Sequence, residues 1–294
     1  MVWVAIVQIR ASALPGFNDC GRRTVARALT REVERKGFEL RRNRPSIGAA
    51  VGTTTHAAAH VIQSARVANP GLTHDELISL VPASLTHALE GFHAEIADGI
   101  TWDDSTPNTL AAQQQIERMV RAYLPALRAM APPAHVELSL EAGVGDGWRL
   151  TGTLDILTID GHLDDLKTGY VSRPYHAQLG AYSLLARAND LDVRTVGISF
   201  VERSRLSHTQ RPLQAQSYDL GVAERTAWNT IERVKREVGA FLESGSPDVI
   251  SANPMSLMCR ANYCPAFGTS FCRLASEREP VSSESSEQPR NETT

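Results

Sequence analysis

The chain has 294 residues and a formal net charge of −3, with 42% hydrophobic and 21% charged residues. This balance is that of a folded globular protein, and it excludes a disordered or fibrous chain and a uniformly basic nucleic-acid coat. The apolar run over residues 1–9 is too short to span a bilayer and lacks a signal peptide's basic flank and cleavage site. We interpret it as a strand and expect a cytoplasmic protein with no membrane partner.

Hydrophobic periodicity and turn residues predict a largely helical first half followed by a sheet. Helices are expected over residues 11–40, opening near Cys20, and over 47–67, 72–100 and 109–130. Strands are expected over residues 136–140, 148–159, 162–167 and 196–201, with helices over 174–189 and 223–242. We predict a single α/β domain over residues 1–275. Residues 276–294, rich in Ser, Glu and Pro, are predicted to be disordered.

Basic residues gather near the start of the chain. Residues 22–44 hold nine Lys and Arg against three Glu, a local charge of +6. A basic stripe on a mostly acidic body is typical of selective phosphate contact, and a merely solvated helix face is the alternative.

The centre of the functional hypothesis is a hairpin that carries Asp155 on one strand and Asp165 and Lys167 on the next. Side chains alternate across a strand, so the register decides whether the three groups can meet. A two-residue turn at Asp160-Gly161 would send Asp165 and Lys167 to the face away from Asp155. A three-residue turn, with Gly161 left-handed in a bulge, puts Asp155 opposite Asp165 with Lys167 on the same face. We predict this second register.

Facing carboxylates repel each other unless a positive group lies between them. Mg²⁺ prefers oxygen ligands, and it lowers the pKa of a bound water enough to make a nucleophile near neutral pH. Lys167 could orient that water or stabilise charge on a phosphate. The alternative is that Asp165 and Lys167 only solvate an edge strand, because D-x-K is common by chance.

Four spaced motifs, taken in order, favour the functional interpretation. The series resembles that of the RecB-type branch of the PD-(D/E)XK nuclease superfamily: Gly52-x-x-x-His56, Gly152-x-x-Asp155, Asp165-x-Lys167-x-Gly169 and Gln178-x-x-x-Tyr182. The resemblance implies a restriction-endonuclease-like core, a small mixed sheet flanked by helices. It also implies a metal-dependent centre formed by His56, Asp155 and Asp165 with Lys167. In the family, the Gln and Tyr of the last motif help to hold DNA and the site.

Several of these positions have other interpretations. A lone helical His such as His56 is often structural, and His60, one turn further on, competes for any role. The sequence between them lacks the Glu of a zinc-protease helix, which excludes that class. Tyr182 could simply pack in the core. Glu137 matches an acid often seen before the second motif, and its role is secondary in this hypothesis.

The chain has four cysteines, Cys259-x₄-Cys264-x₇-Cys272 near one end and Cys20 near the other. In a reducing compartment such cysteines are candidate metal ligands. The set resembles the iron-sulfur clip of some nucleases of this superfamily, including CRISPR-associated adaptation nucleases and phage RecB-like exonucleases. That resemblance implies a 4Fe-4S cluster joining the two ends of the domain. A zinc ion at the four thiolates and scattered buried cysteines are the alternatives.

Taken together, the motifs predict a Mg²⁺- or Mn²⁺-dependent DNA exonuclease. By family resemblance it would act on single-stranded or frayed ends in recombination, repair or phage DNA processing. We find no phosphate-binding motif of the form G-x-x-x-x-G-K-[ST], which a helicase motor would need. A separate helicase or recombinase partner is therefore possible. The alternative is a non-catalytic DNA-binding or assembly protein with the same fold.

Overall fold

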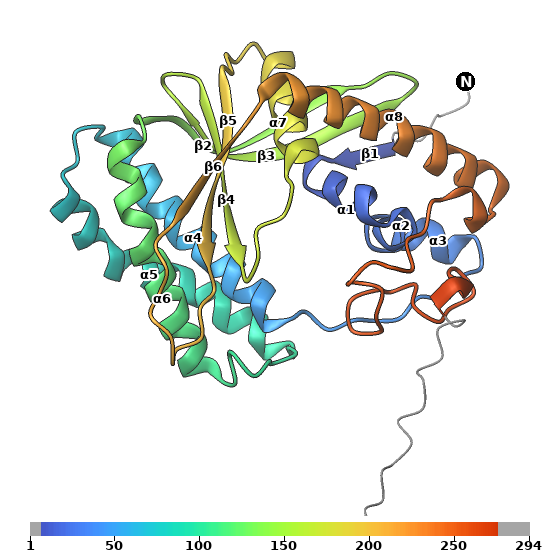
Figure 1. Cartoon of the computed structure of the whole chain (residues 1–294), viewed down its shortest axis with the longest axis horizontal. Helices are drawn as coiled ribbons and strands as arrows, with labels where there is room; N and C mark the ends of the chain where they lie inside the picture. The colour runs from blue at the N-terminus through green and yellow to red at the C-terminus, as the bar shows by residue number, and fades with distance from the viewer. Residues whose placement is uncertain (1–6, 276–294) are drawn as a thin grey trace, which may run out of the picture.

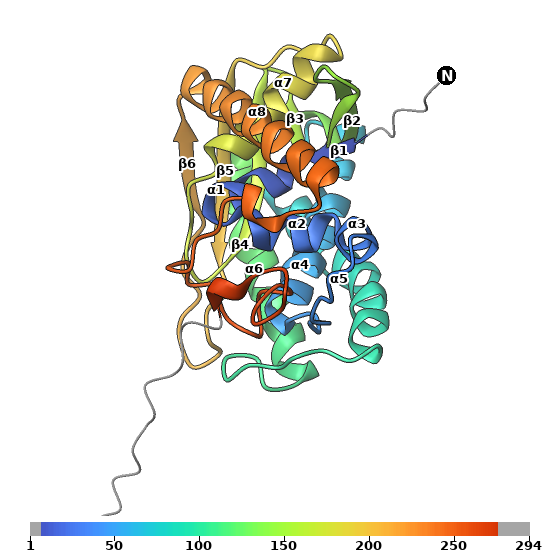
Figure 2. The same cartoon turned by 90° about the vertical axis from the view of Figure 1, so that its right-hand side faces the viewer.

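A mixed six-stranded sheet forms the centre of the computed structural model, which describes residues 7–275 (Figures 1 and 2). The strand order is β1-β3-β4-β5-β6, with β2 paired to β3. The strands are β1 (Val7–Arg10), β2 (Pro133–Gly143), β3 (Trp148–Thr158), β4 (His162–Gly169), β5 (Thr195–Glu202) and β6 (Gln214–Tyr218). The helices are α1 (Leu14–Asp19), α2 (Gly21–Ala28), α3 (Thr30–Arg35), α4 (Ile47–Ala68), α5 (His74–Ala97), α6 (Thr109–Ala129), α7 (His176–Ala188) and α8 (Leu220–Ser244). Short 3-10 helices span Ala11–Ala13, Pro247–Val249 and Arg273–Ala275.

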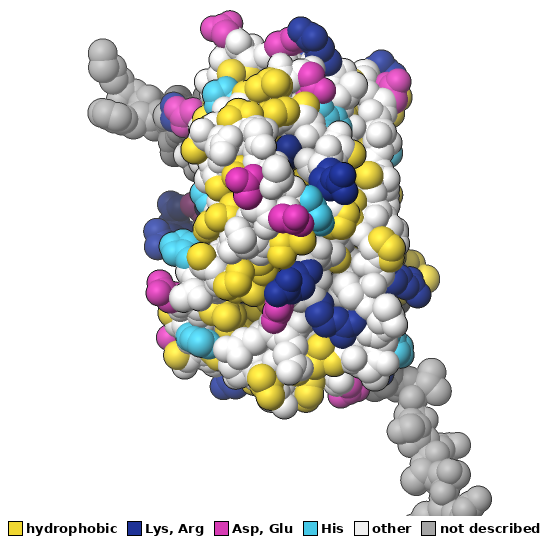
Figure 3. Space-filling view, turned by 90° about the vertical axis from the view of Figure 1, so that its left-hand side faces the viewer, with side chains coloured by type: hydrophobic (Ala, Val, Ile, Leu, Met, Phe, Trp, Pro, Cys, Tyr) yellow, Lys and Arg dark blue, Asp and Glu magenta, His cyan; other side chains and the backbone are white. Residues whose placement is uncertain are grey.

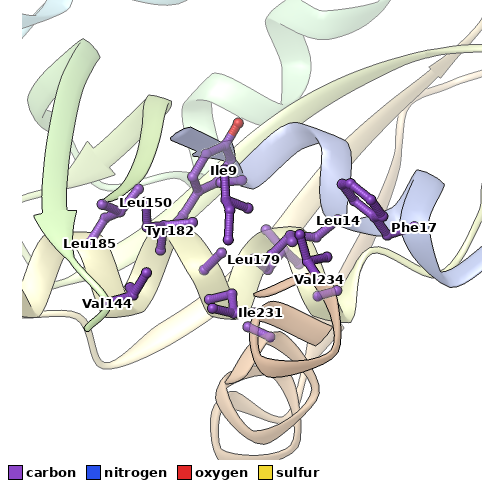
Figure 4. Close-up of a cluster of buried hydrophobic side chains, with 14 of the residues drawn as sticks. Ile9, Leu14, Phe17, Val144, Leu150, Leu179, Tyr182, Leu185, Ile231 and Val234 are labelled. Carbon is purple, nitrogen blue, oxygen red and sulfur yellow. The ribbon is translucent and has the colours of Figure 1, made fainter. Parts of the chain in front are cut away.

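Helices cover the sheet with two separate apolar clusters. One cluster packs α1, α7 and α8 against the sheet, and Figure 4 shows Leu14, Leu179 and Ile231 among its side chains. The other joins α4, α5 and α6 to residues such as Ile156 and Leu166 on β3 and β4. Figure 1 shows α4, α5 and α6 on one side of the molecule and α1, α2 and α8 on the other. This arrangement is the expected α/β core of a sheet flanked by helices.

Local capping explains where the long helices begin. Ser46 accepts a hydrogen bond from the Ala49 amide at the start of α4, and Thr73 and Glu76 form a reciprocal capping box at the start of α5. Asp219 caps α8, which ends at Gly245 in the left-handed conformation (φ 72°). Such caps satisfy amides and carbonyls that the helix itself leaves unpaired. No helix within residues 7–275 is long and apolar enough to cross a membrane.

Most predicted elements agree with the structure, and the differences have local causes. The helical region over residues 11–40 is divided into short helices, because Cys20 and Leu29 have non-helical backbones. Strand β2 is longer than predicted, and the polar strand β6 was not predicted. The predicted tail over residues 276–294 lies outside the described residues, as does most of the strand predicted over residues 1–9.

The predicted three-residue hairpin turn is confirmed. Gly161 has φ 82°, and its amide donates to the Thr158 carbonyl. Strands β3 and β4 pair Leu157 with Leu163 and Ile156 with Asp164. Continued by one residue, this register puts Asp155 opposite Asp165.

Side chains of α2 tie the two ends of the described chain together. Arg22 donates to Asp248 and to the Ile250 carbonyl, and Arg23 pairs with Asp19 and donates to Ser256. Arg22 and Arg23 are 7% and 6% exposed. These first two members of the predicted basic stripe therefore hold the C-terminal segment rather than face a phosphate, which corrects that part of the prediction. Phosphate contact by the exposed arginines of α2 and α3 stays a prediction.

Candidate active site

Three potential metal ligands converge from three different elements. His56 on α4, Glu137 on β2 and Asp155 on β3 each offer a donor atom, and these atoms lie within 4.8 Å of one another. His56 Nδ1 is 3.4 Å from Asp155 Oδ2. The three side chains line a groove of about 730 Å³ that continues past Thr53 and Gly48 along the first turns of α4. The groove gives the donors access to a ligand from outside.

The position of Asp155 follows from how strands share the edge of β3. β2 pairs with β3 along nearly its whole length, so β1 and β4 must both use the opposite edge. β1 pairs with residues 148–151 and β4 with residues 156–157, which leaves a gap between them. Asp155 lies at this gap, where its Oδ2 accepts the Leu166 amide at 2.8 Å in place of a backbone carbonyl. The carboxylate is thus held by the sheet itself.

Glu137 reaches the site through an unusual backbone conformation. Its φ is 50°, one of few positive values at non-glycine residues within residues 7–275. The neighbours Val136 and Leu138 pair with Ile156 and Leu154, so Glu137 is beside Asp155 on the adjacent strand. A left-handed conformation costs such a residue about 1–3 kcal/mol, and residues of this kind cluster at functional sites. The sequence analysis ranked Glu137 second, and its place opposite Asp155 in the strand pattern was the available signal.

Asp165 and Lys167 form a buried ion pair next to these donors. Lys167 Nζ is 2.5 Å from Asp165 Oδ2 and 5.2 Å from the centre of the Tyr175 ring. The Asp165 side chain is 1% exposed and that of Lys167 18%. Asp165 is not among the three donors that lie within 4.8 Å of one another, so its assignment as a metal ligand stays a prediction.

Burial shifts the acid-base equilibria of the site. Burial raises the pKa of Asp155 to about 7 and that of Asp165 to about 7, although Lys167 opposes both shifts. Burial lowers the pKa of His56, with Lys167 adding to the effect, so this imidazole is neutral at neutral pH. Burial also acts to lower the pKa of Lys167, but the Asp165 and Asp155 carboxylates outweigh it and raise that pKa. Three carboxyl groups thus face one ammonium group.

The Gln and Tyr of the last motif lie behind the acids. Gln178 Nε2 donates to Tyr182 Oη at 2.9 Å and is 3.4 Å from Asp165 Oδ1. Both side chains are buried, with Tyr182 in the apolar cluster of Figure 4. They therefore orient Asp165 from behind rather than form an open surface, and the core-packing interpretation of Tyr182 holds together with its contact to Gln178.

The glycines of the motifs make this approach possible. A Cβ at Gly152 would lie 2.8 Å from Tyr182 Cε1, and a Cβ at Gly52 would lie 2.7 Å from Thr168 Oγ1. Since real Cβ atoms do not approach so closely, α7 and α4 reach the sheet only because these positions lack side chains. His60 also lines the groove, and its Nδ1 has no hydrogen-bond partner.

Two larger grooves differ in chemistry from the site. One of about 810 Å³ lies between α6 and β4–β6, and one of about 1050 Å³ lies beside α2 and α3. Neither is lined by His56, Glu137 or Asp155. On the face that Figure 3 presents, charged side chains of both signs are scattered among apolar ones, so no single-sign field marks a binding surface there.

All four cysteines line one small pocket between α2 and the C-terminal segment. None of them is in a disulfide. Burial raises the pKa of Cys264 to about 11, and repulsion from the other three sulfurs adds to the shift. Among the described residues, the four sulfurs form no group within 4.8 Å of one another, unlike the donors at Asp155. As predicted, cysteines from the two ends of the described chain lie together in one pocket. Their sulfurs are spaced more widely than the donor atoms of the acid site.

The fold and the acid-lysine site together define a restriction-endonuclease-like nuclease. The family model of the PD-(D/E)XK nuclease superfamily matches residues 9–272, and this chain belongs to that superfamily. A protein from Eubacterium rectale described as a "putative exonuclease" has a similar structure, with a TM-score of 0.52 and 10% identity over 87% of this chain and 88% of that chain. This similarity shows the fold alone. The structure of SSO0001 aligns over 70% of this chain and 84% of that chain, with 11% identity and a TM-score of 0.26, too low to bear on the fold. No curated protein matches the chain.

Proposed function

We propose that this protein is a Mg²⁺- or Mn²⁺-dependent DNA exonuclease of the RecB-type branch, acting on single-stranded or frayed ends. The observation that carries the proposal is the convergence of His56, Glu137 and Asp155 on an open groove beside the buried Asp165–Lys167 pair. Membership of the nuclease superfamily supports phosphodiester hydrolysis, and the fold of the Eubacterium rectale protein agrees with an exonuclease.

The donor set fits a hard divalent cation. Two carboxylates and a neutral imidazole are ligands that Mg²⁺ and Mn²⁺ accept, and three carboxyl groups beside a single ammonium leave negative charge to be balanced. His56, Glu137 and Asp155 would hold the ion, with Asp165 as a further ligand. When bound, the ion would supply an activated water and balance charge on the phosphate.

The protein's own residues prepare the reaction in two ways. Lys167 stays protonated because the adjacent carboxylates raise its pKa, so its ammonium group can stabilise negative charge on a phosphate oxygen. The Gln178 amide and the Tyr182 hydroxyl fix Asp165 from behind. The neutral His56 retains a lone pair for coordination, since burial keeps its pKa low.

At the cysteine pocket we propose a 4Fe-4S cluster, with zinc as the alternative. One zinc ion with Zn–S bonds of about 2.3 Å needs sulfurs roughly 3.8 Å apart in a tetrahedron. A cluster of four irons needs a wider ring of thiolates. The preference for the cluster rests on the resemblance of the four-cysteine set to the iron-sulfur clip of some nucleases of this superfamily. Visible absorption of anaerobically purified protein tests this, because a colourless sample loaded with zinc would overturn it.

A cleavage assay on end-labelled single-stranded DNA tests the main proposal. The wild-type protein should cut in Mg²⁺ or Mn²⁺ and not in EDTA, and Lys167→Ala and Asp165→Ala should each reduce the rate by about a hundredfold or more. Arg225→Ala, at an exposed cation on α8 outside the basic stripe of residues 22–44, is the control and should keep full activity. Metal-dependent cutting that survives both site substitutions would refute the assignment.

The remaining elements of the proposal concern context. We propose that residues 1–275 act as one nuclease domain and that a helicase or recombinase supplies unwound ends. End-labelling at each terminus in the same assay gives the polarity of cutting, and a circular single strand separates exonuclease from endonuclease action. Repair, recombination and phage DNA processing are all compatible with such an activity.

A further inference from the structure

A buried arginine that the nuclease reaction does not use packs against Gly48, one of the residues that line the site groove. Arg203, directly after β5, is 4% exposed. Its guanidinium donates to Asp103 at 2.7 Å and to Thr106 at 2.6 Å, and Thr106 in turn donates to Gln115. A guanidinium held by these two hydrogen bonds, one of them to a carboxylate, is fixed in position. This network therefore holds the Arg203 guanidinium as a rigid support for a side chain packed against it.

The ring of Tyr170 packs on the Arg203 guanidinium. Arg203 Cζ is 4.3 Å from the centre of the Tyr170 ring, and the Arg203 amide donates to the Gly169 carbonyl at 2.7 Å. Tyr170 is nevertheless 47% exposed. The ring thus has a cation on one face and follows a residue that is hydrogen-bonded to Arg203, while much of its surface stays open. An aromatic side chain that is already ordered loses little entropy when it binds a ligand.

The support of this ring lies next to the site groove. A Cβ at Gly48 would lie 3.0 Å from Arg203 Nη2, and Gly48 lines the same groove as Asp155. Tyr170 also follows Lys167 by three residues along the same strand end, or roughly 10 Å at the usual strand rise. A nucleotide adjacent to one whose phosphate lies at Lys167 could reach the ring.

We infer that Tyr170, backed by Arg203, is a stacking platform for an unpaired base of the DNA strand that occupies the groove. The inference rests on the proposed nuclease function and names the feature of its substrate that the enzyme reads. An aromatic face can stack on any base, but only on a base that is not held within a DNA duplex. The platform therefore selects single-stranded or frayed ends. In this role Tyr170 positions the substrate and is not one of the proposed metal ligands.

Binding without cleavage tests the platform. Single-stranded oligonucleotides carrying a fluorophore are titrated with protein in EDTA, and anisotropy is measured. Tyr170→Ala should weaken binding about tenfold or more, and Tyr170→Trp should retain it. Trp228→Ala is the matched control, because Trp228 is also 47% exposed but lies on α8, whereas Tyr170 directly follows the strand that carries Asp165 and Lys167. Thermal melting of each variant reports its folding.

An abasic scan separates stacking from a general structural effect. Each oligonucleotide of the series lacks one base, and the abasic position moves stepwise along the strand from each end. At one position the wild type should lose affinity, whereas Tyr170→Ala should lose none. Equal losses in both proteins, unchanged binding by Tyr170→Ala, or no binding of single strands by the wild type would each overturn the platform. Loss of metal-dependent cleavage with this binding pattern intact would overturn only the proposed nuclease function.

Discussion

The acid site and the cysteine pocket are built on opposite kinds of scaffold. His56, Glu137 and Asp155 are carried by a helix and two paired strands, so backbone hydrogen bonds fix them. Three of the four cysteines lie in the segment after α8, which consists almost entirely of turns. The side chains of Arg22, Arg23 and Arg27 attach that segment to α2.

This difference indicates which of the two sites needs a bound metal group to keep its structure. The acid site keeps its geometry through the sheet, but it gathers buried carboxyl groups with raised pKa values, and these destabilise the fold when ionised. The cysteine pocket has little regular structure. Its bound group should therefore stabilise the fold, whereas the acid site should weaken it unless a cation is bound.

The largest effect on stability should come from breaking the cysteine pocket. Cys264→Ser should remove the bound metal group and lower the melting temperature by about 10 °C, because binding energy at a structural metal site is also folding energy. Limited proteolysis should then cut within residues 251–275. Leu257→Ala, at an 81% exposed side chain of the same segment, is the control and should melt with the wild type. An unchanged melting temperature in Cys264→Ser would mean that α2 and its arginines hold the segment unaided.

An intermediate effect of opposite sign is expected at the acid site. The pKa of Asp155 rises from 3.8 in an unfolded chain to about 7 in the folded protein. The folded state thus holds this proton more tightly, and the stability contributed by Asp155 falls as pH rises from about 4 to about 7. Asp155→Asn should therefore raise the melting temperature by several degrees in EDTA at about pH 8 and have little effect at about pH 4.

Metal provides the control for that measurement. Mn²⁺ should stabilise the wild type at about pH 8 and do much less for Asp155→Asn, since the substitution removes a ligand. A substitution that lowers the melting temperature in EDTA at both pH values would show that the hydrogen bond to Leu166 outweighs the buried charge, and the contrast between the two sites would then fail.

The sequence analysis predicted the parts of the site that follow from local chemistry. Gly161 selects a three-residue turn because it adopts a positive φ, and that turn sets the pairing of Ile156 with Asp164 next to the two acids. The helices predicted to start at residues 47 and 109 do start there, where the Ser46 and Asn108 side chains accept the first free amides. Each of these signals is contained within a few residues.

The features that escaped prediction depend on distant parts of the chain. The gap at Asp155 exists because β1 and β4 share one edge of β3, and no local pattern encodes that pairing. The strained φ of Glu137 needs the surrounding sheet to maintain it. Arg22 and Arg23 had the composition of a phosphate-binding stripe, but each also has a partner more than 220 residues away, which no local pattern reveals. The strand β6 was too polar to predict from periodicity, because it pairs at the sheet edge.

The smallest effect should come from the hydroxyl group of Tyr182, which links the apolar cluster to the acid site. Tyr182→Phe keeps the ring that packs against Gly152 and removes the acceptor of the Gln178 amide. Cleavage should slow about threefold to tenfold, in line with the loss of one hydrogen bond, and the melting temperature should change little. Gln178→Ala should slow cleavage further, because it also removes the group that faces Asp165. Steady-state kinetics should place both effects on kcat rather than KM, since neither side chain is exposed to bind DNA. A Tyr182→Phe variant with wild-type kcat would show that Gln178 holds Asp165 without help, and that the ring alone explains the tyrosine at this position.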